Sequence, residues 1–291
     1  MLSYQHEYHA GNHADILKHT ALISILNSLT QKEKPFTVID SHASAGTFSL
    51  DDERIRKTAE AKNGIEKLIS YVQKTGTKDI PQSLSRYLEA QTPYCKCRLY
   101  AGSPELERLY LRSQDTHFAV ELHPQALESL TACCKNDILT KDGKRSAAVK
   151  THIRCEDSYK ALEALTPPLV KRGLVLVDPS YEDASDYTQV TRTLTDVHRK
   201  WNTAIIALWY PLITRRKNET SQMLSALETA AKTGTNPCTC TRKELRLKDP
   251  ETLTKEDGAH LYGSGMFVIN PPWHFEEEMD EAISFLQNAL A

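Results

Sequence analysis

The sequence lacks the features of an exported or membrane-spanning protein. Residues 1–6 have no positively charged start followed by an apolar core, and the longest apolar stretch, around residues 204–213, is too short to cross a bilayer. The seven cysteines follow no disulfide-framework spacing, which is typical of proteins in a reducing compartment. We therefore expect a cytoplasmic protein with no membrane partner.

An excess of positive charge, zinc-ligand spacing and a hydrolase motif are also missing. The formal net charge of −2 gives no global basic surface, so nucleic-acid contacts would have to come from local patches. The pairs Cys95/Cys97 and Cys238/Cys240 are too closely spaced for a typical zinc site. In strands they would be ordinary half-buried thiols on one face. No Gly-x-Ser-x-Gly motif is present, which disfavours a hydrolase.

Strand and helix patterns alternate along most of the chain. Apolar spacing predicts a helix over residues 13–30, and further helices are expected from Pro124 and Asp157. Short apolar runs predict buried strands at residues 36–39, 118–122, 152–155, 174–177, 204–209 and 266–269. Strands that alternate with helices predict a mostly parallel α/β sheet covered on both faces.

A polar section interrupts this alternation after the first strand. It contains two helical patterns separated by Pro81, and we interpret it as an inserted helical subdomain at residues 51–95. The α/β core would then consist of residues 1–50 and 96–291. The first part of the insertion carries cations that could contact RNA, although interspersed acids favour a simple solvated surface. These cations are Arg54, Arg56, Lys57, Lys62 and Lys67.

The most informative motif is Asp178-Pro179-Ser180-Tyr181, which follows the apolar run at residues 174–177. In open parallel sheets, chemistry collects just beyond the carboxyl ends of such strands. The Asp178 side chain and the Pro179 carbonyl could accept hydrogen bonds from the amine of adenine, while Tyr181 could stack on the flipped base. The same residues also commonly turn a chain after a strand. The motif alone therefore leaves both interpretations open.

Acidic residues follow other predicted strands as well. Asp40 follows the first strand, Glu121 falls near the end of the next, and Asp157 comes after the strand at residues 152–155. An acid at the end of the second strand of a nucleotide-binding sheet is well placed to bind ribose hydroxyls, which predicts this role for Glu121. Asp157 could accept from a cofactor adenine, near the backbone of Ser158. One such acid is usually only a helix cap, but the series favours a cofactor-binding edge.

The turn at residues 40–46 contains a single glycine, Gly46. A dinucleotide pyrophosphate needs close approach to the backbone and usually several glycines. S-adenosylmethionine has no phosphate and demands less of this loop. The sequence therefore favours the methyl donor over a nicotinamide or flavin.

Histidines are dense near the N-terminus. His9 with His13, and Asp15 with His19, have spacings that could bind a metal on one helix face. Residues 11–12, Gly-Asn, would break that helix. We therefore interpret this segment as polar lining of a cofactor or base pocket and expect no metal.

Several further motifs occur together with these. They are Tyr4, residues 9–15 with 17–19, residues 40–43, 102–104, 121–124, 178–182, 208–211, 264–266 and 270–273. In this combination, from Met1 into the final helix, the sequence resembles the RlmJ family of 23S ribosomal RNA adenine-N6 methyltransferases. The N-terminal motif and the Glu-Leu-His-Pro motif at 121–124 are far more specific than a general methyltransferase pattern.

The resemblance implies a Rossmann-like class I methyltransferase core, with a mostly parallel seven-stranded sheet, helices on both faces and an inserted helical subdomain. It implies S-adenosylmethionine as the cofactor and one adenine of 23S ribosomal RNA as the target, met by a monomer on protein-free RNA or early in assembly. It also implies Asp178 as the catalytic acceptor and a substrate contact at Tyr4. The motif itself predicts catalytic roles for Pro179 and Tyr181 and a substrate contact at Tyr181. The implied cofactor contacts are Lys18, His19, His42, Ser103, Glu121, Asp157, Ser158 and Asp178.

The sequence departs from the family at two positions. Ser44 stands where the family usually has glycine, and would be strained if the backbone there needs a positive φ. Ser180 replaces a proline, which loosens the turn but leaves its neighbours in place. We expect retained activity with weakened cofactor binding. The alternatives are a DNA adenine-N6 methyltransferase and a catalytically weakened RNA- or cofactor-binding protein.

A second motif competes with the first. Asn270-Pro271-Pro272-Trp273 also follows an apolar run and fits the amino-methyltransferase pattern better on its face. It comes, however, where a methyltransferase core has its final antiparallel strand rather than its catalytic loop. We therefore predict a structural or RNA-facing role for it.

Overall fold

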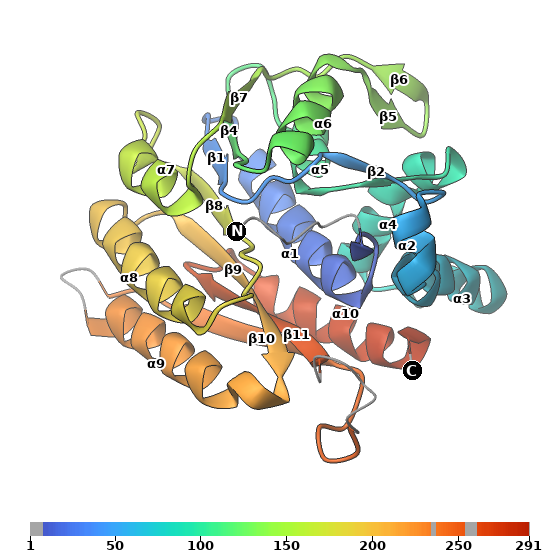
Figure 1. The fold of residues 1–291 in the computed structure, drawn as a ribbon. Helices are drawn as coiled ribbons and strands as arrows, with labels where there is room; N and C mark the ends of the chain where they lie inside the picture. Colours follow the sequence, from blue (N-terminus) through green and yellow to red (C-terminus); the bar gives the residue numbers. More distant parts are fainter. Residues whose placement is uncertain (1–7, 234–236, 254–260, 291) are drawn as a thin grey trace.

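The protein is built around one seven-stranded sheet with the order β10-β11-β9-β8-β1-β4-β7. The computed structural model describes residues 8–233, 237–253 and 261–290 (Figure 1). The strands of this sheet are β1 (Thr37–Asp40), β4 (Thr116–Val120), β7 (Thr151–Arg154), β8 (Gly173–Val177), β9 (Ile205–Ile213), β10 (Cys240–Arg246) and β11 (Leu261–Ile269). Six are parallel, and β11 runs antiparallel between β9 and β10. This confirms the predicted Rossmann-like class I methyltransferase fold.

Helices cover both faces of the sheet (Figure 1). One face packs on α1 (His13–Thr30), α5 (Ser103–Tyr110) and α10 (Phe275–Leu290), and the other on α7 (Ser158–Leu165), α8 (Ala184–Lys200) and α9 (Lys217–Thr233). Alternate residues of β8 divide between these two cores: Leu174 and Leu176 enter the first, Val175 and Val177 the second. Burial on both faces explains why this strand is an unbroken apolar run. No helix within the described ranges is long and apolar enough to span a membrane.

The helix α1 is buried on nearly all sides. Its N-cap is Asn12, whose side chain accepts from the Asp15 amide nitrogen at 2.9 Å, and Gly11 before it has a φ of 79°. The interruption of the helix that was expected at residues 11–12 is therefore the point where α1 begins. Fourteen of its residues, from Ala14 onward, are buried, because the sheet lies on one side and inserted helices lie on the other. A helix that is apolar on most sides belongs inside a protein.

The insertion between β1 and β4 begins and ends at a small antiparallel pair, β2 (Thr47–Ser49) with β3 (Leu99–Ala101). It contains four helical segments, of which the last three pack against α1 or α10. They are α2 (Glu53–Thr58), the π-helical turn η2 (Lys62–Glu66), α3 (Lys67–Thr75) and α4 (Gln82–Lys96). The exact domain boundaries remain a prediction.

Two of the five cations named in the insertion are paired with its own acids. Arg54 lies 2.8 Å from Asp52, and Arg56 lies 3.3 Å from Asp51, which also binds Arg98 at 3.1 Å. These pairs fit the interpretation as a solvated helix surface.

Three sequence expectations on local structure were wrong or incomplete. Cys95 lies in the last turn of α4 rather than in a strand, although its thiol is free and half-buried as expected. The strand β10 was not located from the sequence. The hairpin of β5 (Ile138–Thr140) and β6 (Gly143–Arg145), which follows α6 (Pro124–Lys135), was also missed.

Candidate active site

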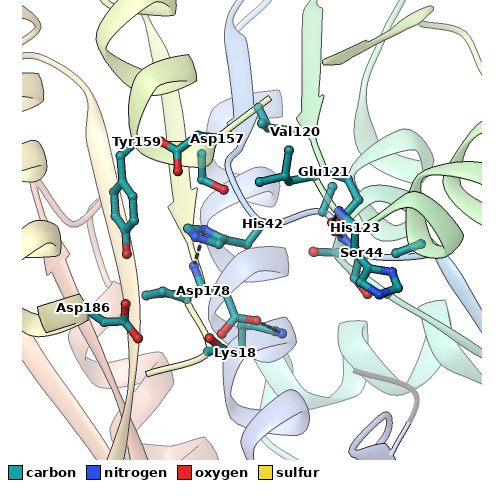
Figure 2. Close-up of a pocket in the computed structure, with 18 of the residues that line it drawn as sticks. Lys18, His42, Ser44, Val120, Glu121, His123, Asp157, Tyr159, Asp178 and Asp186 are labelled. Carbon is teal, nitrogen blue, oxygen red and sulfur yellow. Dashed lines mark hydrogen bonds and ion pairs between the residues drawn. The ribbon is translucent and has the colours of Figure 1, made fainter. Parts of the chain in front are cut away.

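A pocket opens at the carboxyl ends of β1, β4, β7 and β8, and is lined by the loops that follow these four strands and by the side of α1 (Figure 2). It brings together Lys18, His19, His42, Ser103, Glu121, Asp157, Ser158, Asp178 and Pro179. These residues come from segments far apart in the sequence, and each was named as a candidate site residue. Tyr4 lies outside the described residues.

Asp178 follows β8 directly, and its carboxylate pairs with Lys18. The Lys18 ammonium group contacts Asp178 Oδ2 (Figure 2). It also lies 2.9 Å from Asp15 Oδ1. Burial alone would lower the pKa of Lys18, but the two carboxylates outweigh it and raise the pKa above its usual value. Lys18 was predicted to contact the cofactor. The structure places its ammonium group against the acid that was predicted to be catalytic.

His42 lies beside Asp178 in the loop after β1 (Figure 2). Its Nδ1 lies 2.8 Å from Ser41 Oγ and 3.4 Å from the backbone nitrogen of Asp178. Desolvation lowers the pKa of His42 to about 4, although Asp178 and Asp157 act in the opposite direction. The imidazole is therefore neutral near pH 7. A neutral ring can accept or donate a hydrogen bond in the pocket without adding charge.

Tyr181 does not face the pocket, which contradicts the prediction that its ring stacks on the target base. The side chain is 4% exposed, and its hydroxyl donates to the backbone oxygen of Trp209 at 3.1 Å. Its ring centroid lies 4.6 Å from that of Tyr187. The physical reason is packing: the ring fills the core between β9 and α8, and its one polar atom already has an acceptor there.

Glu121 holds the loop after β1 against the loop after β4. Its Oε2 accepts from the Ser44 amide nitrogen at 2.9 Å, and its Oε1 accepts from the His123 amide nitrogen at 2.6 Å. Each oxygen keeps a further lone pair for a ligand hydroxyl. Ser44 has a φ of 53°, so the backbone does adopt the left-handed conformation in which a serine is strained.

Asp157 both caps a helix and faces the pocket. Its Oδ1 accepts from the Lys160 amide nitrogen at 3.0 Å, which makes it the N-cap of α7. Ser158, the first residue of that helix, and Tyr159 line the same pocket. The sequence left open whether Asp157 caps a helix or binds a cofactor. In this position it can do both.

Ser103 and His19 are fixed from below the pocket. The Ser103 hydroxyl donates to Asp40 Oδ2 at 2.7 Å. His19 Nδ1 lies 2.8 Å from the Tyr100 hydroxyl oxygen, and the two rings stack with centroids 5.7 Å apart. Both contacts hold pocket-lining side chains in one orientation.

Sequence reasoning missed several pocket residues. Tyr159, Asp186, Glu182 and His123 also line the cavity. Tyr159 follows directly after the predicted contacts at 157–158, so position along the chain was a usable signal. Asp186 had none, because it reaches the pocket from the first turn of α8, where an acid is usually explained by helix capping.

The competing motif at residues 270–273 lies at the other end of the strands from the pocket. Asn270 follows β11, which runs antiparallel, and its Nδ2 donates to the backbone oxygens of Asn202 and Ala204, both at 2.8 Å. These two residues lie just before β9. The amide thus ties strand ends together, as expected for a structural role. Trp273 is 86% exposed on this edge.

With the geometry established, comparisons with known proteins identify the family. The family model described as ribosomal RNA large subunit methyltransferase D, RlmJ, matches residues 33–291. The chain belongs to this family. The resemblance inferred from the sequence motifs is therefore confirmed, and the protein is an RlmJ-family methyltransferase.

Individual relatives cover the whole chain. Ribosomal RNA large subunit methyltransferase J of Escherichia coli (strain K12) is 34% identical over 293 residues, which span 100% of this chain and 94% of the relative. The protein of the same name from Haemophilus influenzae is 35% identical over 294 residues, with the same coverage. A crystal structure of a protein from Legionella pneumophila str. Philadelphia 1 superposes with a TM-score of 0.79 at 28% identity, covering 97% of this chain and 94% of that one.

Proposed function

We propose that this RlmJ-family protein transfers a methyl group from S-adenosylmethionine to the exocyclic N6 of one adenine in 23S ribosomal RNA. The observation that carries the proposal is the position of Asp178: a carboxylate paired with a buried lysine, at the rim of a pocket that also presents Glu121 and Asp157. The family supplies the reaction class.

The residues present fit S-adenosylmethionine. Among the described residues that line the pocket, the only lysine or arginine is Lys18, and Asp15 and Asp178 already neutralise it. A pyrophosphate would find little positive charge here, whereas a phosphate-free nucleoside needs mainly hydrogen-bond acceptors. In this proposal Glu121 accepts from the ribose hydroxyls and Asp157 from the adenine amine. Bound S-adenosylmethionine supplies an electrophilic methyl group.

The catalytic role falls to Asp178 and the carbonyl of Pro179. Both are acceptors, and together they can bind the two hydrogens of the target amine and direct its lone pair into the pocket. Lys18 orients the Asp178 carboxylate by holding one of its oxygens. As the methyl group passes to the amine nitrogen, its bond to sulfur breaks and leaves a neutral thioether. The amine becomes acidic as the new bond forms, and its surplus proton passes to the carboxylate of Asp178.

A different aromatic residue is needed to hold the target base, since Tyr181 is buried. The Tyr159 ring lines the pocket and packs edge-on against His42, with centroids 5.9 Å apart. It therefore offers a fixed, partly exposed aromatic surface beside His42, in the same pocket as Asp178 (Figure 2). Flipped bases are commonly held by such surfaces. Tyr4 remains a proposed substrate contact.

The test is methyl transfer from tritium-labelled S-adenosylmethionine to three substrates: protein-free 23S RNA, assembled large subunits and duplex DNA. We expect label only in N6-methyladenosine of the RNA, with the free RNA as the better substrate, as fits a monomer that acts in the cytoplasm before assembly is complete. Label in DNA would favour the DNA methyltransferase. Cofactor binding with no transfer to any substrate would favour the weakened binding protein.

A further inference from the structure

A groove lies at the other end of the strands from the active-site pocket. It is lined by the end of α1 and the residues that follow it, by the starts of β8 and β9, and by the loop after β11. None of the described residues that line this groove also lines the pocket. The groove is therefore a separate feature, which the proposed chemistry does not use.

Trp273 projects from the loop after β11 and lines this groove. It is 86% exposed, and the His274 ring packs edge-on against it with centroids 4.9 Å apart. The Phe275 amide nitrogen donates to the backbone oxygen of Pro272 at 3.1 Å, which closes the loop around the two rings. A single exposed aromatic residue needs no explanation by itself, so its surroundings decide whether it belongs to a site.

Lys32 and Arg172 give the groove positive charge. The Arg172 guanidinium group donates to the backbone oxygens of Leu29 and Lys34. These oxygens fix its position but do not neutralise its charge. Within the ranges that the structure describes, no carboxylate lies within ion-pair distance of Arg172 or of Lys32. Both cations are therefore available to an anion in the groove.

The acidic residues nearby do not cancel this charge. Glu278 is the one acid among the described lining residues, and it is already bound by Arg86 at 3.1 Å and by the Ser24 hydroxyl at 2.6 Å. Glu276 and Glu277 also belong to the first turn of α10, but they do not line the groove. The charge that faces an occupant is thus positive, although the whole chain has a formal net charge of −2.

This chemistry fits single-stranded nucleic acid. An aromatic ring on which a base can stack, next to cations that bind phosphates, is the usual arrangement in such sites. A protein partner would need a wider apolar surface, and Trp273 is the one large exposed apolar side chain among the described lining residues. A second copy related by a two-fold axis would place the same cations against each other. A polyanion with unpaired bases meets neither obstacle.

We propose that the groove is a second RNA-binding site, in which Trp273 stacks on an unpaired base of 23S ribosomal RNA while Lys32 and Arg172 bind neighbouring phosphates. The inference rests on the proposed function, because it takes this RNA as the substrate. It also gives a physical basis to the RNA-facing role predicted for residues 270–273. Contacts so far from the reacting amine stabilise the bound substrate and the transition state equally, so they act on KM rather than on kcat.

The experiment is filter binding of protein-free 23S RNA at several salt concentrations, followed by steady-state methyl transfer to the same RNA. Trp273→Ala should weaken RNA binding by about five- to 150-fold, the range for loss of one stacked base. KM for the RNA should rise by a similar factor, with kcat near that of wild type. Trp273→Phe keeps an aromatic ring and should retain most of the affinity. Lys32→Gln should make the slope of log affinity against log salt shallower by about 0.7, as for one phosphate contact to a single strand.

Two exposed residues outside the groove provide matched controls. Leu169 is 103% exposed in the loop before β8, and Lys135 is exposed in the last turn of α6. Neither lines the groove or the pocket. Leu169→Ala should bind the RNA as wild type does, and Lys135→Gln should leave the salt slope unchanged.

Three other results have distinct meanings. RNA affinity and KM of wild type in Trp273→Ala would overturn the inference. So would a variant that alters only the sedimentation of the free protein, because the groove would then be a contact between copies. RNA binding that depends on Trp273, with no methyl transfer by the wild type to any substrate, would contradict the proposed function and leave the second site in place.

Discussion

Two similar motifs end up at opposite edges of the same sheet. Asp178-Pro179-Ser180-Tyr181 follows β8 and Asn270-Pro271-Pro272-Trp273 follows β11, each after a buried apolar strand. β8 runs parallel to its neighbours and β11 runs antiparallel, so the two strands deliver their final residues to opposite edges. The comparison teaches that strand direction, more than the match to a motif, decides which of the two motifs lines the pocket.

The polar side chains of the two motifs also differ in what remains available. The Asn270 Nδ2 donates hydrogen bonds to the backbone oxygens of Asn202 and Ala204. The Asp178 carboxylate is held by Lys18 at one oxygen and still lines the pocket. One motif therefore closes a structural contact, and the other leaves acceptors facing a cavity.

The largest expected contrast is in turnover. Asp178→Ala should lower the single-turnover rate of methyl transfer by about 10²- to 10³-fold, because it removes a preorganised acceptor for the target amine. The dissociation constant for S-adenosylmethionine should change far less. Asn270→Ala serves as the comparison, with a rate per folded molecule close to wild type. Loss of transfer only in Asn270→Ala would reverse the assignment of the two motifs.

The next effect concerns the buried partner of the catalytic motif. Lys18→Met should lower the free energy of unfolding by ~3–5 kcal/mol, because it leaves Asp15 and Asp178 without their common cation in a buried site. Lys18→Arg retains the charge and should lose less. Urea denaturation measures both. A Lys18→Met protein as stable as wild type would show that this contact does not form in solution.

A smaller change in stability is expected at the structural motif. Asn270→Ala loses two hydrogen bonds and leaves two backbone carbonyls short of a donor, at a cost of about 1–3 kcal/mol. Asn270 also has a φ of 55°, which glycine tolerates better than alanine. Asn270→Gly separates the two causes: if strain matters, it should be the more stable variant by urea denaturation.

The last effect is a pH dependence of stability to which His42 contributes as one of several titrating histidines. The pKa of His42 is lowered to about 4 in the folded protein, whereas an unfolded histidine titrates near 6.5. Between these values the unfolded state binds more protons, so stability falls as the pH drops from about 6.5 to 4. His42→Asn should make this slope shallower by at most one proton. An unchanged slope in unfolding experiments from pH 4 to 7 would contradict the assignment.

The sequence predicted the parts of this fold that depend on local pattern. The apolar run of β8, the start of α1 at Gly-Asn and the polar residues after the parallel strands all follow from the order of residues nearby. The sequence analysis expected strain at Ser44 if its backbone had a positive φ, and the structure has that conformation.

Features decided by distant parts of the chain were not predictable in this way. Lys18 and Asp178 are 160 positions apart, and no local pattern links them. The direction of the Tyr181 ring depends on space between β9 and α8. The strand β10 has no apolar run, because at this edge of the sheet its inward positions include Thr241 and Lys243 besides Leu245. Lys243 is held there by Asp280 at 2.8 Å.

The burial of α1 has a consequence for how this protein could evolve. The helix carries Lys18, which pairs with Asp178. Its outer side is covered by residues of the insertion, such as Ile65, Leu84 and Tyr87. Deletion of residues 51–95 would therefore expose apolar side chains of α1 to solvent and leave the position of Lys18 less well fixed. The insertion is thus part of the core of this protein. A shorter relative without it would need other apolar residues to cover α1.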